Sequence, residues 1–265
     1  MAYIVNEELY KRTLWLNKTI DFLFGTEIIE YDMQSAGLSL IKEFKLLPSE
    51  DIAVLDKMDK KSKNVKIGLY QKDKSFAKKL LECFVEARKR FIIGNELTEE
   101  NVLAIKKDAI FVIDTPIKNK DFGEIHFTSK NSYTSYIKLN KLEFYINTST
   151  NTIDIKGLGQ GDELEKVHEL HDEYILKFIM KFTKLRENMV EKEVMTNYIA
   201  NFCKKYRSRS LPVGFYRELG KGNSYALYDD VLEEVINVED TSDIGNLIIT
   251  YNYFSYIIPL ASLYF

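Results

Sequence analysis

The 265-residue sequence predicts an α+β fold. Residues 74–95 carry apolar side chains at the three-to-four-residue spacing of one helix face. Several short strand-like segments follow between residues 124 and 155, and residues 162–206 return to a helical pattern. Helices and strands that are grouped separately along the chain are typical of an α+β protein, whereas a parallel α/β sheet requires regular alternation.

The first hundred residues are expected to be mostly helical around one strand. Apolar residues recur at helical spacing over residues 5–24, and Gly25 should end that helix. Residues 26–32 are strand-like. Three further segments have helical patterns: residues 35–44, 49–58 and 74–95. The Lys-rich stretch between the last two, residues 59–66, is expected to be a charged loop.

The next part of the chain predicts a sheet. Residues 102–113 alternate and then run apolar, as a central strand does. Shorter strand-like segments follow at residues 124–127, 133–139, 142–147 and 152–155. Glycines within residues 157–161 indicate a hinge, so we expect two domains, residues 1–160 and residues 161–265. The second domain should be helical over residues 162–206, with another helix at 229–237.

Composition excludes several classes of protein. A net charge of −3 and a pI near 5.8 do not fit a simple DNA-coating protein, so any nucleic-acid contact needs a local basic patch. No apolar run approaches the roughly 20 residues of a membrane helix, and charged residues near the N-terminus argue against a signal peptide. Only two cysteines, Cys83 and Cys203, indicate a reducing cytoplasm. Few prolines and many Lys, Asn, Ile and Tyr suggest an AT-rich genome, as in a phage of a low-GC host.

Two aspartates stand at the edges of apolar, strand-like runs. Asp32 follows Glu30-Tyr31, and Asp108 precedes Ala109-Ile110-Phe111-Val112. If the strands are neighbours, the carboxylates can hold two divalent cations about 4 Å apart, the arrangement used for in-line displacement at phosphorus. Mg²⁺ suits this site because it binds carboxylates together with substrate phosphates, and Mn²⁺ is the alternative. The other interpretation is that Asp32 caps the helix expected after it.

The first aspartate segment resembles a catalytic motif of the family B DNA polymerases of phages and viruses. That motif reads Asp-x-x-Ser-Leu-Tyr-Pro-Ser-Ile, and Asp32, Ser35 and Ser39 stand at matching offsets. Ala36-Gly37-Leu38 replaces its Leu-Tyr-Pro centre.

The second segment is similar to the third motif of the same family, Asp-Thr-Asp-Ser-Ile-x-Val. Asp108 aligns with the second Asp of that motif, whereas Lys106 stands where the family has the first. The Lys156-Gly157 pair is similar to the segment that follows the polymerase palm hairpin. The resemblance covers roughly residues 26–160, and the pieces occur in the family's order.

The resemblance implies a reduced polymerase palm. It implies a palm-like antiparallel sheet with packed helices, a helical thumb-like C-terminal part, and nucleotidyl transfer from a primer 3′-hydroxyl. Asp32 and Asp108 would be the catalytic metal ligands for two Mg²⁺ or Mn²⁺ ions, and Ser35 and Ser39 would bind the nucleotide. The family's fingers motif, Lys-x3-Asn-Ser-x-Tyr-Gly, is absent between residues 42 and 107. We also expect no proofreading exonuclease, because 30 residues precede Tyr31.

Basic clusters are the predicted nucleic-acid contacts, with DNA the more favoured partner than RNA. They comprise Lys60, Lys61, Lys63, Lys66, Lys156, Lys204, Lys205 and Arg207. Such charge runs are commonly only solvated surfaces. For the polymerase interpretation, a protein partner is expected to supply the missing polymerase parts. The alternative to an enzyme is a catalytically inactive palm that binds nucleic acid or a protein partner. A location in the host cytoplasm and no membrane partner are expected in either case.

Overall fold

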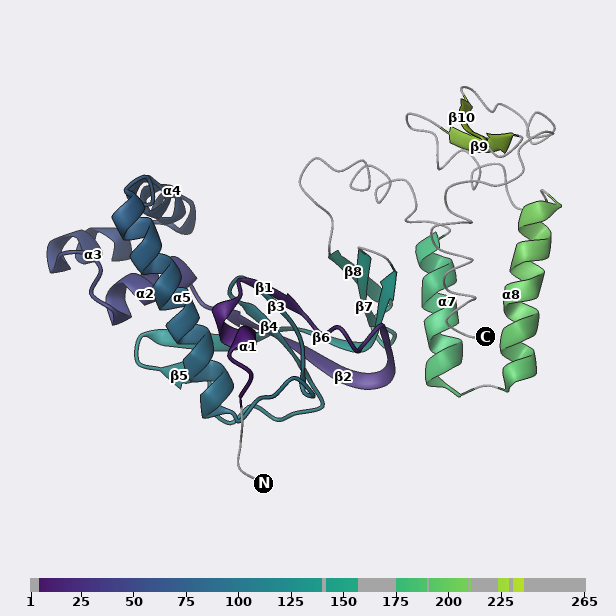
Figure 1. Cartoon of the computed structure of the whole chain (residues 1–265), viewed down its shortest axis with the longest axis horizontal. Helices are drawn as coiled ribbons and strands as arrows, with labels where there is room; N and C mark the ends of the chain where they lie inside the picture. The colour runs from purple at the N-terminus through teal and green to yellow at the C-terminus, as the bar shows by residue number, and fades with distance from the viewer. Residues whose placement is uncertain are drawn as a thin grey trace. The chain divides into compact units, whose positions relative to one another are not determined.

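The computed structural model describes residues 5–139, 142–156, 175–189, 191–208, 210, 224–228 and 231–235 (Figure 1). The predicted α+β class is confirmed, since helices accompany an antiparallel sheet. The chain divides into two compact units, Met1–Ile20 with Thr26–Ser132, and Asp21–Gly25 with Tyr133–Phe265. The domain boundary and the hinge expected near residue 160 lie outside the described residues.

The helices of the first unit are α1 (Glu8–Lys11), α2 (Ala36–Glu43), α3 (Ser49–Asp56), α4 (Lys60–Tyr70) and α5 (Lys74–Gly94). Of these, α2, α3 and α5 lie where the sequence predicts them. The loop expected over residues 59–66 is wrong, because α4 occupies most of it. The Asp59 side chain accepts hydrogen bonds from the backbone N–H groups of Lys61 and Ser62 and so caps the N-terminus of α4. The lysine-rich composition predicts a loop because it gives no clear apolar period.

The long N-terminal helix expected over residues 5–24 is also wrong. After the four residues of α1 the chain forms strand β1 (Leu14–Leu16) and then enters strand β2 (Phe22–Met33). Strand β1 pairs antiparallel with strand β3 (Val102–Lys106), and Leu16 lies opposite Ala104. Backbone pairing with a strand far away in the sequence thus overrides the local helical pattern.

The single strand expected over residues 102–113 is a tight hairpin. Strand β3 ends at Lys106, strand β4 (Ala109–Ile113) begins at Ala109, and Lys107 and Asp108 form the turn. Strand β4 also pairs antiparallel with β2. In the first unit the strand order is β1-β3-β4-β2-β6, and the short β5 (Asp121–Phe122) pairs with β6 (Ile125–Leu139).

One face of this sheet packs against the helices. Tyr31 and Met33 of β2 belong to the buried core, as does Phe91 of α5. The Phe91 ring centroid lies 4.4 Å from that of Phe127 on β6 and 5.5 Å from that of Tyr31. Because side chains alternate along a strand, burying Tyr31 and Met33 directs the intervening Asp32 to the opposite face.

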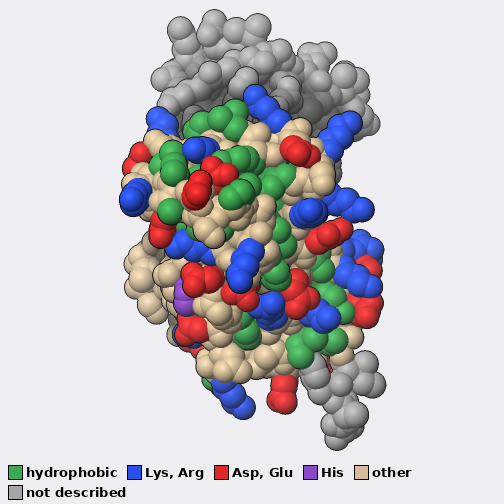
Figure 2. All heavy atoms as spheres, turned by 90° about the vertical axis from the view of Figure 1, so that its left-hand side faces the viewer, with side chains coloured by type: hydrophobic (Ala, Val, Ile, Leu, Met, Phe, Trp, Pro, Cys, Tyr) green, Lys and Arg blue, Asp and Glu red, His purple; other side chains and the backbone are tan. Residues whose placement is uncertain are grey.

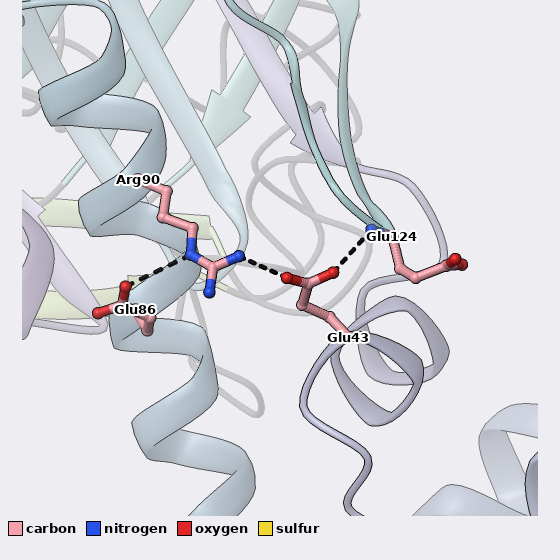
Figure 3. Close-up of polar contacts among 4 residues, drawn as sticks. All are labelled: Glu43, Glu86, Arg90 and Glu124. Atoms are coloured by element: carbon pink, nitrogen blue, oxygen red, sulfur yellow. Dashed lines mark hydrogen bonds and ion pairs between the residues drawn. The ribbon is translucent and has the colours of Figure 1, made fainter. Parts of the chain in front are cut away.

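A polar cluster joins helix α2 to helix α5 and to the turn before β6 (Figure 3). Arg90 donates from Nη1 to Glu43 Oε1 at 2.6 Å, and the backbone N–H of Glu124 donates to Glu43 Oε2 at 2.8 Å. The bond from Glu124 and then the bond from Arg90 lower the pKa of Glu43. Gly123 has φ +69°, and the Glu43 carboxylate fills the space that a Cβ at Gly123 would need.

The strand segments expected at residues 133–139, 142–147 and 152–155 are confirmed, although the first of them forms one strand, β6, with the segment expected at 124–127. Residues Ser135–Leu139 of β6 pair with β7 (Leu142–Asn147), and β7 pairs with β8 (Thr152–Lys156). The helical prediction for residues 162–206 is confirmed where the structure describes them, as α7 (Ile175–Glu187) and α8 (Lys192–Arg207).

The helix expected at residues 229–237 is wrong. Residues 231–235 form strand β10 (Val231–Val235), which pairs with β9 (Ser224–Tyr228).

Elsewhere in the second unit, Glu187 at the end of α7 accepts hydrogen bonds from Thr134 and Ser135 of β6, both at 2.6 Å. In the part of the chain that the structure describes, no helix has the length and apolarity to span a membrane.

The Gly123 turn yields a stability prediction. Gly123→Ala should lower the free energy of unfolding by about 1 kcal/mol or more, because alanine is strained at positive φ and its Cβ would collide with the Glu43 carboxylate. Urea unfolding followed by circular dichroism measures the change. Gly68→Ala is the matched control: Gly68 lies inside α4 with open space around it, so alanine should raise the free energy of unfolding by about 0.4–1 kcal/mol. Equal effects of the two substitutions would contradict this account of Gly123.

Candidate functional site

The structure brings Asp32 and Asp108 together at one end of the β3–β4 hairpin. In the pairing of β2 with β4, Asp32 lies opposite Ala109, the residue that directly follows Asp108. Asp32 is the penultimate residue of β2, and Asp108 lies in the hairpin turn. Asp32 is therefore a strand residue and does not cap α2, whose N-cap is Ser35, so the capping interpretation is wrong.

The environment of Asp108 disfavours its ionised form. Asp108 is half-buried, and this burial is the main cause that raises its pKa. A backbone hydrogen bond works against the shift, the negative charge of Asp32 adds to it, and the positive charges of Lys130 and Lys107 reduce it. A nearby cation stabilises the ionised form of such a carboxylate, because the opposite charge offsets the cost of burial and of the neighbouring negative charge.

An ammonium group already lies at this carboxylate pair. Lys130 of β6 places Nζ 3.5 Å from Oδ2 of Asp32 and 3.8 Å from Oε1 of Glu30. Glu30 is only 2% exposed, and its Oε2 accepts a hydrogen bond of 2.7 Å from Asn131 Nδ2. Partial burial opposes protonation of Lys130, but the charges of Asp32, Glu30 and Asp108 outweigh it and raise the pKa of Lys130.

Arg88 of α5 binds the turn that carries Asp108. The fully buried guanidinium donates from Nη1 to the Lys107 carbonyl at 2.9 Å and from Nε to the Tyr10 carbonyl at 3.0 Å. Burial lowers the pKa of Arg88 to about 10, and the negative charge of Asp108 opposes that shift. Lys107 has φ +59°, so the bond from Arg88 holds a residue in a left-handed conformation that lysine rarely adopts.

Lys106, which the resemblance to family B DNA polymerases aligns with an aspartate, is separated from Asp32 by one strand. Lys106 on β3 lies opposite Ala109 on β4, and Ala109 lies opposite Asp32 on β2. The lysine found at the carboxylate pair is Lys130. Sequence reasoning missed both Lys130 and Glu30, since only the placement of β6 reveals the first, and the motif comparison assigned no role to the second.

The two serines predicted to bind nucleotide lie at the start of α2. Ser35 is exposed, has φ +47° and makes no side-chain capping bond. Ser39 is buried, and its hydroxyl donates to the backbone carbonyl of Gln34 at 2.8 Å. The geometry therefore leaves Ser35 accessible near the end of β2, whereas the hydroxyl of Ser39 is used inside the protein.

The predicted basic contacts fall in both units. In the first unit, Lys60 and Lys61 are exposed at the start of α4, and Lys63 and Lys66 are half-buried. In the face drawn in Figure 2, the Lys and Arg side chains of the described residues are interspersed with Asp, Glu and apolar side chains and form no continuous basic patch. The predicted contacts of the second unit are Lys156 on β8 and Lys204, Lys205 and Arg207 on α8.

The donor set at the site is small. Within the described ranges, no group of three or more His, Cys, Asp or Glu is arranged to hold a metal ion. The pair formed by Asp32 and Asp108 can supply only part of a coordination shell, so a cation there needs further oxygens from a bound substrate or from water.

Comparison with known proteins identifies the family. A family model described as Bacteriophage PBS1 gene 130 protein matches residues 4–263, so the chain belongs to this family. The family supports the phage origin that the composition suggested. No match was found among curated proteins.

The raised pKa of Asp108 yields a prediction about stability. Because its pKa is higher in the folded than in the unfolded protein, the ionised carboxylate destabilises the fold at neutral pH, and this effect disappears as the pH falls below the unfolded value of about 3.9. Asp108→Asn should therefore raise the free energy of unfolding at pH 7, and the difference from the parent should shrink toward pH 3. Urea titrations at several pH values measure it. A constant difference over that range would contradict the electrostatic explanation.

Proposed function

We propose that the chain transfers nucleotides onto nucleic acid at a reduced, polymerase-palm-like site. The observation that carries the proposal is the placement of Asp32 at the end of β2 beside Asp108 in the β3–β4 turn. A two-metal site for in-line displacement at phosphorus needs carboxylates that lie close enough together to bind both metal ions. The order of these segments along the chain, which resembles family B DNA polymerases, supports the same reaction.

The chemical properties of the pair fit a divalent cation. Asp32 is 31% exposed, so solvent and ions reach it, and the ionised form of Asp108 is disfavoured until positive charge is added. Mg²⁺ or Mn²⁺, two ions in the active form, would stabilise the attacking and leaving oxygens when bound. Since Mg²⁺ is commonly held by one or two carboxylates plus substrate phosphates, the small protein donor set is compatible with it.

The nucleic acid would be bound through its phosphates. Helices α3, α4 and α5 lie between the two aspartates in the sequence, the position that the fingers occupy in family B polymerases. The lysines of α4 would contact the backbone of DNA, or less favourably RNA. In the second unit, the predicted phosphate contacts are Lys156, Lys204, Lys205 and Arg207. This activity belongs in the host cytoplasm, with a protein partner supplying parts that the chain lacks.

A second candidate function is binding without catalysis. The ion pairs of Lys130 with Asp32 and Glu30 favour it, because an ammonium held at the carboxylates reduces the negative charge available to a metal. Lys106 also favours binding without catalysis, because it stands where the resemblance to family B DNA polymerases places an aspartate. In that case the protein would bind nucleic acid or a protein partner through the same surfaces.

Primer extension with Mg²⁺ and then Mn²⁺, on DNA and RNA templates, tests the enzymatic proposal. The parent should add nucleotides to a labelled primer, and Asp108→Asn should reduce the rate at least about 100-fold. The expected loss is large because a catalytic metal contributes several kcal/mol to the transition state and each 1.4 kcal/mol or so changes the rate tenfold.

Asp114→Asn is the matched control for this experiment. Asp114 follows the other end of β4, its Oδ1 accepts a hydrogen bond from the backbone of Glu27, and its φ of +40° suits asparagine. Its rate should equal that of the parent. An inactive parent under all cation and template combinations would favour the binding function, and an active Asp108→Asn protein would place the chemistry elsewhere.

Replacing Lys60, Lys61 and Lys63 together by Gln tests nucleic-acid binding under either function. Affinity should fall nearly equally for all sequences, and the dependence of log K on log salt should flatten by about 0.9 per lost phosphate contact on duplex DNA and about 0.7 on single strands. Fluorescence anisotropy at several salt concentrations measures both. The control replaces the exposed Lys18, Lys45 and Lys118 by Gln. Identical slopes for the two triple variants would show that the α4 lysines are only solvated.

A further inference from the structure

We propose that Lys130 is an internal competitor for the cation at Asp32 and Asp108, so that a divalent ion binds only in exchange for the Lys130 ammonium. This inference rests on the proposed cation site and specifies how its occupancy is regulated. The carrying observation is that Nζ of Lys130 lies within 4 Å of carboxylate oxygens of both Asp32 and Glu30.

The surroundings of Lys130 fix where its ammonium group lies. Asp32 and Glu30 are two positions apart on β2 and therefore project from the same face of the sheet. Asn131, the neighbour of Lys130 on β6, donates a hydrogen bond from Nδ2 to Oε2 of the buried Glu30 carboxylate. The ammonium thus lies between an immobilised buried carboxylate and the partly exposed Asp32.

The same geometry allows Lys130 to leave. Its side chain is 52% exposed, and both of its contacts are longer than the roughly 2.8 Å of a strong charge-assisted hydrogen bond. A lysine side chain has four rotatable bonds and reaches solvent easily. When it turns away, Asp32 loses its counter-charge, and its carboxylate becomes available to a divalent ion.

Competition follows from the charges. While Lys130 is in place, its positive charge repels a cation at Asp32, because like charges a few ångströms apart at a protein surface are only partly screened. Removing the charge should therefore tighten cation binding by about tenfold or more.

Binding of Mn²⁺ to the full-length chain tests the proposal, by calorimetry and by loss of the free-ion signal in electron paramagnetic resonance. Lys130→Met and Lys130→Gln should both bind Mn²⁺ about tenfold or more tightly than the parent, whereas Lys130→Arg should not, since it keeps the charge. Lys138→Met is the matched control, because Lys138 also lies on β6 and pairs with a different carboxylate, Asp21, at 3.5 Å. It should bind Mn²⁺ like the parent.

The outcomes separate this inference from the proposed function. If the parent binds Mn²⁺ and the neutral Lys130 variants bind it equally well, the competition is refuted and the cation site stands. If only the neutral variants bind it, the competition is supported and the parent's proposed catalysis fails. If none of the folded proteins binds Mn²⁺, both proposals fall.

Adding Asp32→Asn to Lys130→Met should abolish the gain in Mn²⁺ affinity, and a gain that persists would refute the proposed location of the cation at Asp32. Circular dichroism establishes that each variant is folded, and the Gln variant replaces the Met variant if burial of Glu30 makes the latter unstable.

Discussion

Arg88 connects three parts of the first unit that are far apart in the sequence. It projects from α5, donates to the carbonyl of Tyr10 in α1, and donates to the carbonyl of Lys107 in the β3–β4 turn. A buried guanidinium is costly, and the lowered pKa of Arg88 reflects that cost. Its hydrogen bonds and the nearby charge of Asp108 offset part of it. The position of the turn, and with it the position of Asp108, therefore depends on how α5 packs on the sheet.

The division of the sheet into two faces organises the rest of the unit. One face is covered by the helices and contains the ring cluster of Phe91, Phe127 and Tyr31. Strand alternation then directs Glu30 and Asp32 to the other face, next to Lys130. The cluster of Glu43, Arg90 and Glu124 holds α2 to α5 and to the turn before β6. The segment that follows Asp32 and the segment that precedes Lys130 are therefore joined through Glu43 and attached to α5.

The candidate site combines features that oppose stability with features that favour ion binding. Burial and the charge of Asp32 disfavour the ionised form of Asp108, and Glu30 is buried next to a lysine rather than exposed to solvent. Groups whose charges are held at some cost to the fold are common at functional sites, although structural ion pairs also produce them. The resident ammonium of Lys130 distinguishes this site from a simple pair of acidic surface residues. It also makes cation affinity the quantity that separates the catalytic from the binding function.

The α+β class, the helices α2, α3 and α5, and the strands of the β6–β7–β8 meander follow from local sequence. Helices α2 and α5 have a strong apolar period, α3 has Glu50 and Asp51 in its first turn, and the strand segments are bounded by turn residues. The sequence also singled out Asp32 and Asp108 by their places at strand edges. That residues 14–16 form a strand depends on long-range contacts, since the pairing partner β3 lies about ninety residues further along the chain. Likewise, the hairpin at Lys107-Asp108, the anchoring by Arg88 and the ion pair of Lys130 depend on contacts between distant strands and helices. No local pattern encodes them, because backbone pairing and burial choose among conformations that the local sequence leaves nearly equal in free energy.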